Sequence, residues 1–402
     1  MDGGCDGGAD GDDGAGGLRI LWYINGADGD VPWQPRGRIP PSLAHLRSVA
    51  CALDHLGYYG ALSTARETIA LVSDTTRLRF MIPEYPGVKP PALLAEQAQV
   101  FDHYSGGRLI FNQVNGADPV LARYGRFETK AQRYALSQEY WALVRALYLD
   151  GTDGYDGAGF TFGPRYKPAI AGPRQRGGVP VWGTGASPEG IAHAAETLDL
   201  YLSFLAEPPA LSDTFGALRR AAAARGRHIP VGVLASVVVR DTDDEAWAHF
   251  EWQLSQTDPA EMNRLADRNL RSFGFAPLDE LTSEDPQVQS RIDALRRGRL
   301  PTREELEFAP GLAAGLTTWT SGEPPFDIAG KGSGNYLVGS PETVAALITE
   351  LSAQLGIDSW ILSGWPLAAE AERFARQVMP LLNVRPYEPP DLTDAGLEAA
   401  AR

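Results

Sequence analysis

The sequence contains little cysteine, little histidine and no excess of basic charge. Two Cys among 402 residues cannot build a disulfide framework or a CxxC metal site, so a reducing cytoplasmic environment is expected. Acidic residues outnumber basic ones by 51 to 36, which argues against nucleic acid or an anionic membrane surface as the main partner. No run approaches the roughly 18 apolar residues of a membrane span, and the N-terminus has no basic and apolar regions of a signal peptide.

Tails are predicted at both ends of the chain. Residues 1–17 consist mainly of Gly and Asp, so we predict a disordered tail there. A second tail is expected over 386–402. The body between them, 18–385, is predicted to fold as one domain.

Eight short apolar segments, each followed by an amphipathic stretch, predict parallel strands that alternate with helices. The segments are 18–24, 58–63, 78–83, 109–114, 179–184, 199–204, 231–239 and 356–364. Two stretches interrupt the rhythm: 151–173, which suits a hairpin excursion, and 257–340, which reads as irregular and helical. We therefore predict a (β/α)8 TIM barrel with insertions after strands four and seven. A doubly wound open sheet is the alternative, but no GxGxxG follows the first strand.

Several chemistries find little support. The six His fall on predicted helices or their ends, and no HExxH is present, so no metal site is expected. The segment GASPE (185–189) begins like a GxSxG nucleophile motif but lacks its last Gly. A glycosidase would have Glu84 and Glu207 as its only carboxylates at strand ends.

Anion binding is better supported. Thr184, Gly185, Ala186 and Ser187 lie between strand five and the next helix, where free N–H groups and the helix dipole favour a phosphate. An ordinary Gly- and Ser-rich barrel loop is the alternative. The segment GKGSGNY (330–336) is either a flexible linker or a closing lid. Trp22, Trp182 and Trp365 lie in or next to strands that reach the same barrel mouth, which indicates either core packing or a flat aromatic ligand.

A set of segments resembles, in order and at similar spacing, the bacterial-luciferase-like flavin monooxygenases, and among them the alkanesulfonate monooxygenase branch. The resemblance runs from Leu18 to about Val384. Its markers are HLGYYGAL (55–62), RLRF (77–80), AEQAQVFDHYSGGRLIFNQVNGADP (95–119), QRY (132–134), EPP (207–209), RDTDDEAW (240–247), YLVGSPETVAALI (336–348) and LGIDSWILSGWP (355–366).

The resemblance implies a TIM barrel that uses reduced FMN supplied by a separate NAD(P)H:flavin reductase, and usually a dimer or tetramer. It implies that O2 attacks the reduced flavin to give a C4a-peroxyflavin, which oxygenates an organic substrate. It also assigns residues to the cofactor. Tyr134 and Ser187 would hold the phosphate, and Asn112, Asn115 and Gly116 match the strand-four segment that lies along the flavin.

This chain departs from the sulfonate branch at its substrate positions. Leu234 and Ser236 stand where the branch has Arg and His, and Trp365 replaces a Tyr. The segment after strand two is shorter and lacks the branch's Cys, which leaves Ser63, Thr64, Ala65 and Arg66 there. Each change removes a charge or donor that a small sulfonate would use, so we expect a larger, less anionic, partly aromatic substrate.

The predicted site therefore has two groups of side chains. Arg66 and Trp365 are the candidate catalytic residues, and Trp22, Glu84, Leu234 and Ser236 are expected to line the substrate pocket. Two other functions stay open: a deazaflavin (F420)-dependent oxidoreductase on the same barrel, and a non-catalytic flavin-binding homologue.

Overall fold

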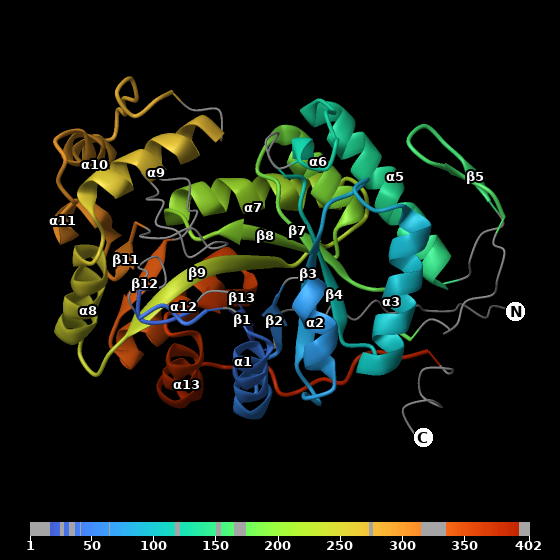
Figure 1. The fold of residues 1–402 in the computed structure, drawn as a ribbon, viewed down its shortest axis with the longest axis horizontal. Helices are drawn as coiled ribbons and strands as arrows, with labels where there is room; N and C mark the ends of the chain where they lie inside the picture. The colour runs from blue at the N-terminus through green and yellow to red at the C-terminus, as the bar shows by residue number, and fades with distance from the viewer. Residues whose placement is uncertain are drawn as a thin grey trace, which may run out of the picture.

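The computed structural model describes residues 17–24, 28–31, 37–40, 42–63, 65–116, 121–149, 154–164, 174–272, 276–314 and 335–393. Its centre is a closed barrel of eight parallel strands (Figure 1). They are β1 (Arg19–Tyr23), β2 (Gly60–Leu62), β3 (Arg79–Glu84), β4 (Leu109–Gln113), β7 (Val181–Gly183), β8 (Leu200–Phe204), β9 (Val231–Val239) and β13 (Ile357–Ser363). Pairing of β9 with both β8 and β13, and of β13 with β1, closes the ring. The predicted TIM barrel is confirmed.

One helix follows each strand and packs on the outside of the barrel. These helices are α1 (Leu43–Leu56), α2 (Ala65–Val72), α3 (Pro91–Ser105), α5 (Lys130–Leu149), α6 (Pro188–Thr197), α7 (Pro208–Ala223), α12 (Pro341–Leu355) and α13 (Leu367–Gln377). Local sequence sets their limits. The Ser42 side chain caps the first turn of α1, and Gly57 ends that helix at φ 83°. A short 3-10 helix, η1 (Met379–Leu381), follows α13.

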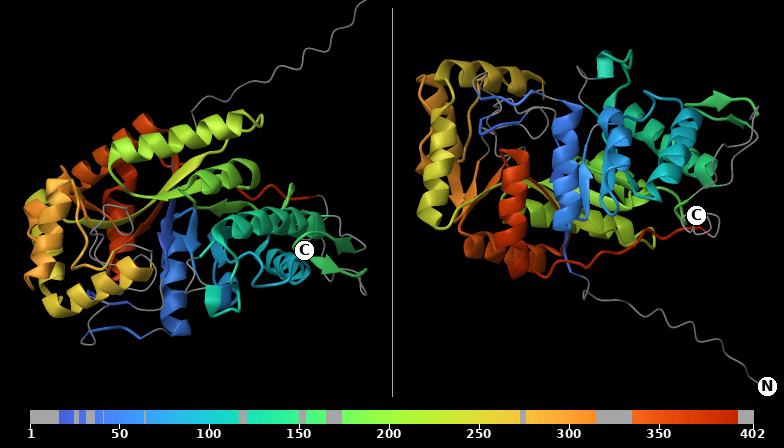
Figure 2. Two further views of the ribbon diagram at one scale, coloured as in Figure 1. Left: turned by 90° about the horizontal axis from the view of Figure 1, so that it is seen from above. Right: turned by 60° about the horizontal axis from the view of Figure 1, so that its bottom comes forward.

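Two insertions lie on opposite sides of the barrel (Figures 1 and 2). The first contains the hairpin β5 (Tyr155–Asp156) and β6 (Thr161–Phe162), as the sequence predicted. The second contains α8 (Asp243–Ser255), α9 (Pro259–Ser272), α10 (Pro286–Arg296), α11 (Arg303–Leu306), β10 (Glu307–Ala309), β11 (Leu312–Ala313) and β12 (Tyr336–Gly339). The sequence analysis missed these three strands because each is short. They extend the main sheet, since β12 pairs in parallel with the second half of β9.

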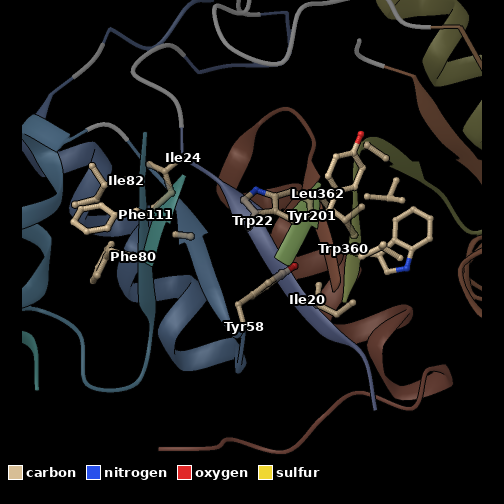
Figure 3. Close-up of a cluster of buried hydrophobic side chains, with 14 of the residues drawn as sticks. Ile20, Trp22, Ile24, Tyr58, Phe80, Ile82, Phe111, Tyr201, Trp360 and Leu362 are labelled. Carbon is tan, nitrogen blue, oxygen red and sulfur yellow. The ribbon is translucent and has the colours of Figure 1, made fainter. Parts of the chain in front are cut away.

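Alternation along the strands separates the barrel interior from the layer under the helices. Leu21, Ile110, Trp182, Leu234 and Ile361 belong to the cluster inside the barrel. Their neighbours along the same strands belong to the larger cluster between barrel and helices. Figure 3 shows part of that outer layer, with the Trp22 and Tyr58 side chains close together.

The chain after Arg385 packs across the amino-terminal end of the barrel. The Arg79 side chain donates to the Glu388 carbonyl at 2.5 Å, and Leu392 pairs with Gln175 in an antiparallel bridge. In Figure 1 this segment runs in red along the bottom of the molecule. Residues 386–393, assigned above to a terminal tail, therefore pack on the barrel. Residues 1–16 and 394–402 lie outside the described residues.

Candidate functional site

The carboxyl ends of β4 and β7 hold a group of amide side chains with unused hydrogen-bonding atoms. Asn112 and Gln113 pair in register with Trp182 and Gly183. The Gln113 side chain donates to Asn115 Oδ1 at 2.7 Å. Within the described part of the chain, Asn112 Oδ1, Gln113 Oε1 and Asn115 Nδ2 are buried without a partner. Because an unsatisfied buried polar group costs about 1–3 kcal/mol, this edge of the barrel is suited to a polar ligand.

The neighbouring loop leads into the N-terminus of α6. Ser187 is its N-cap, and the Ser187 Oγ accepts from the Gly190 N–H at 3.2 Å. The helix dipole adds partial positive charge at this end. The predicted helix start is confirmed.

Two glycines of this loop leave room for the Tyr134 hydroxyl of α5. A Cβ added at Gly190 would lie 2.6 Å from the Gly185 carbonyl oxygen and 2.7 Å from the Tyr134 hydroxyl. A Cβ at Gly185, where φ is 154°, would lie 3.1 Å from the same hydroxyl. The structure thus brings together Tyr134, Gly185 and Ser187, three residues that the sequence analysis assigned to a phosphate.

The buried rings of His193 and Tyr201 lie near this loop. The His193 ring lies 5.4 Å from that of Tyr134, and burial lowers the pKa of His193 to about 4. Both His193 nitrogens are buried without a partner among the described residues. Burial raises the pKa of the Tyr201 hydroxyl well above its ordinary value. Both rings are therefore neutral near pH 7.

The upper interior of the barrel is lined by neutral side chains. From the alternation along each strand, the last inward-facing residues of the eight strands carry no charge. They are Tyr23, Leu62, Pro83, Asn112, Trp182, Phe204, Ser236 and Ser363. The hydroxyls of Ser236 and Ser363 lie 3.0 Å apart, and Leu234 faces the same interior. These positions agree with the prediction that Leu234 and Ser236 face the pocket.

Trp22 lies elsewhere than expected, in the layer between the barrel and its helices. The Trp22 ring packs 5.7 Å from Tyr58 and 6.2 Å from Phe374 and is fully buried. Trp365 is 2% exposed. Trp22 thus packs outward because the period of two along β1 turns it away from the barrel interior.

Glu84 also faces outward. It follows Phe80 and Ile82, both of the outer layer, on the same face of β3. Its carboxylate pairs with the Lys89 ammonium at 2.5 Å beside α3, and burial raises its pKa. Glu84 is therefore part of an outer ion pair rather than of the barrel pocket.

Three further predicted site features are Arg66, Gly116 and the lid, and the described residues cover them only in part. Arg66 lies in the first turn of α2, and its side chain lies outside the described part. Gly116 adopts φ 66°, where a Cβ would lie 3.1 Å from the Leu121 Cγ, so glycine is required. Most of the predicted lid, 330–334, also lies outside the described residues.

The sequence analysis missed three residues near the site. Gln113 lies beside the predicted Asn112, and Gly190 lies three residues after Ser187, so their spacing was available as a signal. His193 was read as a surface or packing residue, and no sequence pattern linked it to Tyr134. That contact depends on how α5 packs on α6.

Neither a metal centre nor a membrane segment is found in the described ranges. No group of three or more His, Cys, Asp or Glu there could hold a metal ion. No helix there is long and apolar enough to cross a bilayer.

Together, the barrel and the polar cluster at the carboxyl ends of its strands define a TIM barrel with unsatisfied polar groups at the end where such barrels carry their sites. The profile of the luciferase-like monooxygenase family matches residues 31–359. The chain belongs to this family, and the prediction of a monooxygenase-type enzyme is confirmed at that level. The match does not single out the alkanesulfonate branch.

Solved structures share the fold at low identity. Riboflavin lyase (RcaE), solved with modified FMN and riboflavin, has a TM-score of 0.71 at 18% identity and covers 93% of this chain and 94% of its own. The long-chain alkane monooxygenase LadA has a TM-score of 0.69 at 17% identity, and the match covers 90% of this chain and 90% of LadA. DmoA from Hyphomicrobium sulfonivorans has a TM-score of 0.70 at 16% identity, and the match covers 95% of this chain and 93% of DmoA. An F420-dependent secondary alcohol dehydrogenase is more distant, with a TM-score of 0.59 at 14% identity. The match covers 91% of this chain and 99% of the dehydrogenase.

Proposed function

We propose that this protein is an FMNH2-dependent two-component monooxygenase, supplied by a separate NAD(P)H:flavin reductase, that oxygenates a neutral organic substrate other than a simple alkanesulfonate. The observation that carries the proposal is the convergence of Tyr134, Gly185 and Ser187 at the N-terminus of α6, next to unsatisfied amides at the end of β4. RcaE was solved with modified FMN, and a 3,6-diketocamphane monooxygenase of the same fold with FMN.

The residues present fit a flavin mononucleotide. In the proposal Tyr134, Ser187 and the backbone of Thr184, Gly185 and Ala186 bind the phosphate. Asn112, Asn115 and Gly116 bind along the flavin, where the free amide atoms meet its polar edge. Reduced FMN would supply the electrons that activate O2. The protein's part is to hold the phosphate at one end and to keep the barrel interior free of competing charge.

The substrate class is argued from the lining of the barrel. A sulfonate brought into this interior would lose its hydration and would need charged or multiple hydrogen-bond donors in exchange. The described inward residues offer instead the Trp182 and Phe204 rings, Leu234 and the mutually bonded hydroxyls of Ser236 and Ser363. This lining favours an uncharged, partly aromatic molecule. Arg66 and Trp365 stay candidate catalytic residues of the proposal.

The test uses the full chain with FMN, NADH and a purified flavin reductase under air. Formation of an oxygenated product when neutral aromatic compounds are added, with the peroxide yield per NADH falling below that of the reductase-only control, is the expected result. Alkanesulfonates should give peroxide without product. Binding of deazaflavin F420 with no binding of FMN would instead identify the hydride-transfer alternative. FMN binding with no reaction of reduced FMN with O2 would identify the non-catalytic alternative.

A further inference from the structure

Two serine hydroxyls meet inside the barrel, near the carboxyl ends of two neighbouring strands. Ser236 of β9 and Ser363 of β13 are partners in the strand register, and their hydroxyl oxygens lie 3.0 Å apart. Both residues are fully buried. Leu234 and Ile361 precede them by two residues on the same strands and belong to the inner cluster. By the alternation along a strand, both hydroxyls therefore face the barrel interior.

This pair has one more proton than it can use. Each hydroxyl carries one proton, and only one of the two lies between the two oxygens. Within the described part of the chain, neither hydroxyl has a further hydrogen-bond partner. A buried donor without an acceptor is costly, whereas an unused lone pair on an oxygen costs less. The pair is therefore a site for a group that accepts one hydrogen bond.

The backbone around the pair is fixed by its own hydrogen bonds. The Ser236 N–H donates to the Asn335 carbonyl at 2.9 Å. The Asn335 side chain in turn donates to the Leu205 carbonyl at 2.9 Å, and Asn335 is buried. Ser363 is held by the parallel pairing of β13 with β9. A donor held in place in this way selects for the position of its acceptor.

The pair lies across the barrel from the unsatisfied amide of Asn112. Around the closed sheet, β13 is the fourth strand from β4 in either direction. Asn112 is the last inward residue of β4, and its Oδ1 has no partner in the described residues. Between the two walls the inner cluster contributes Trp182 and Leu234, which are apolar over most of their surface. A molecule in this interior thus meets the flavin side of the proposed function at one wall and a single donor at the other.

We propose that Ser236 and Ser363 form the hydrogen-bonding site for the substrate, and that the substrate is a neutral ketone or aldehyde on an apolar, partly aromatic body. A carbonyl oxygen accepts the spare proton of the pair and adds no proton that needs an acceptor of its own. Ser363 is then a specificity-determining residue, together with Ser236. The inference rests on the proposed function, since it takes the barrel interior to be the substrate site.

The experiment compares three probes of similar shape: the bicyclic ketone tetralone, its alcohol tetralol and its hydrocarbon tetralin. Their dissociation constants are measured by calorimetry with the full-length protein, once saturated with FMN and once without it. Tetralone should bind about five- to tenfold more tightly than tetralin, as expected for one additional hydrogen bond. The infrared carbonyl stretch of bound tetralone should lie below its frequency in hexane, which reports the hydrogen bond without any substitution.

The double variant Ser236→Ala/Ser363→Ala should bind tetralone and tetralin equally, with tetralin binding unchanged. Each single variant keeps one hydroxyl that can donate, so the two single effects should sum to less than the double effect. Replacing both members of a buried pair with apolar groups is nearly neutral for folding, so the double variant should unfold at the wild-type denaturant concentration. Ser359→Ala is the matched control. Ser359 lies on the same face of β13 toward its other end, its hydroxyl donates to Asp358 Oδ1 at 2.6 Å, and its loss should leave the tetralone-to-tetralin ratio unchanged.

Three results would overturn the inference. They are no preference for tetralone over tetralin (including binding of neither), a wild-type ratio in the double variant, and tetralol bound at least as tightly as tetralone. In each case the proposed function stands if FMN binds and another neutral compound is oxygenated. A protein that binds neither oxidised nor reduced FMN would overturn the proposed function, whatever the probes show.

Discussion

Replacing Gly190 with Ala tests whether the turn formed by Gly185, Gly190 and the Tyr134 hydroxyl is as tightly packed as its geometry indicates. An Ala in place of Gly inside a helix normally stabilises by up to about 1 kcal/mol. At Gly190 the new methyl group would lie 2.6 Å from the Gly185 carbonyl oxygen and 2.7 Å from the Tyr134 hydroxyl. One of these contacts is backbone, so it cannot move away cheaply, and such overpacking costs about 1–3 kcal/mol. We therefore expect Gly190→Ala to lower the free energy of unfolding by about 1 kcal/mol.

Gly216, in the middle of α7, provides the comparison. A Cβ there meets only the Arg220 Nη1 at 3.4 Å, an ordinary contact with the end of a flexible side chain. Gly216→Ala should therefore raise the free energy of unfolding by about 0.5–1 kcal/mol. Denaturant unfolding of both variants measures the difference, which should have opposite sign at the two sites.

The same substitution should also weaken flavin binding. Relief of the clash must displace the Tyr134 hydroxyl or the Gly185 loop, and a loss of about 1.4 kcal/mol of binding is tenfold in the dissociation constant. Fluorescence titration with FMN gives this value directly. The reasoning is refuted if Gly190→Ala is as stable as Gly216→Ala and binds FMN like the wild type.

Three other predictions follow from the structure. Tyr134→Phe should weaken FMN binding about five- to thirtyfold, as expected for loss of one hydrogen bond to a charged group, with little change for riboflavin; equal losses for both flavins would contradict a phosphate contact. Because the pKa of His193 is about 4 in the folded protein and about 6.5 when unfolded, its contribution to stability is complete above pH 6.5 and is lost as the pH falls toward 4, by up to about 3 kcal/mol. His193→Phe should remove that loss in unfolding measurements at pH 4.5 and 7, whereas His55→Phe, at an exposed position, should not. A chain that stops at Arg385 should lose at least about 2–3 kcal/mol relative to one that stops at Thr393, since the backbone bonds Arg176 N–H to Asp391 and Thr393 N–H to Arg174 disappear; equal unfolding curves would show that the segment does not stabilise the barrel.

Local patterns in the sequence were sufficient for the fold. A run such as 231–239 is apolar throughout because a parallel strand is buried on both faces, and all nine residues of β9 are indeed buried. The sequence also predicted the start of α6 at Ser187 and Pro188, since N-caps and first-turn prolines depend on neighbouring residues alone. The start of α6 was therefore located from the sequence. The short strands β10 and β11 were not, because strands of two or three residues carry no measurable period.

The tertiary structure decided which side chains meet. Trp22 and Leu234 both lie on barrel strands, yet Trp22 packs under α1 and α13 and Leu234 lies inside the barrel. A shift of one residue in a strand exchanges these two environments, so sequence position near a strand end could not assign Trp22 or Glu84 correctly. The contact between Lys130 and Glu189 joins two helices that are distant in the chain, and only the packing of α5 on α6 brings them together. The sequence thus determined the barrel and the capped start of α6, because both follow from local periodicity and capping. The neutral lining of the barrel followed only from the fold, because it depends on which way each side chain points.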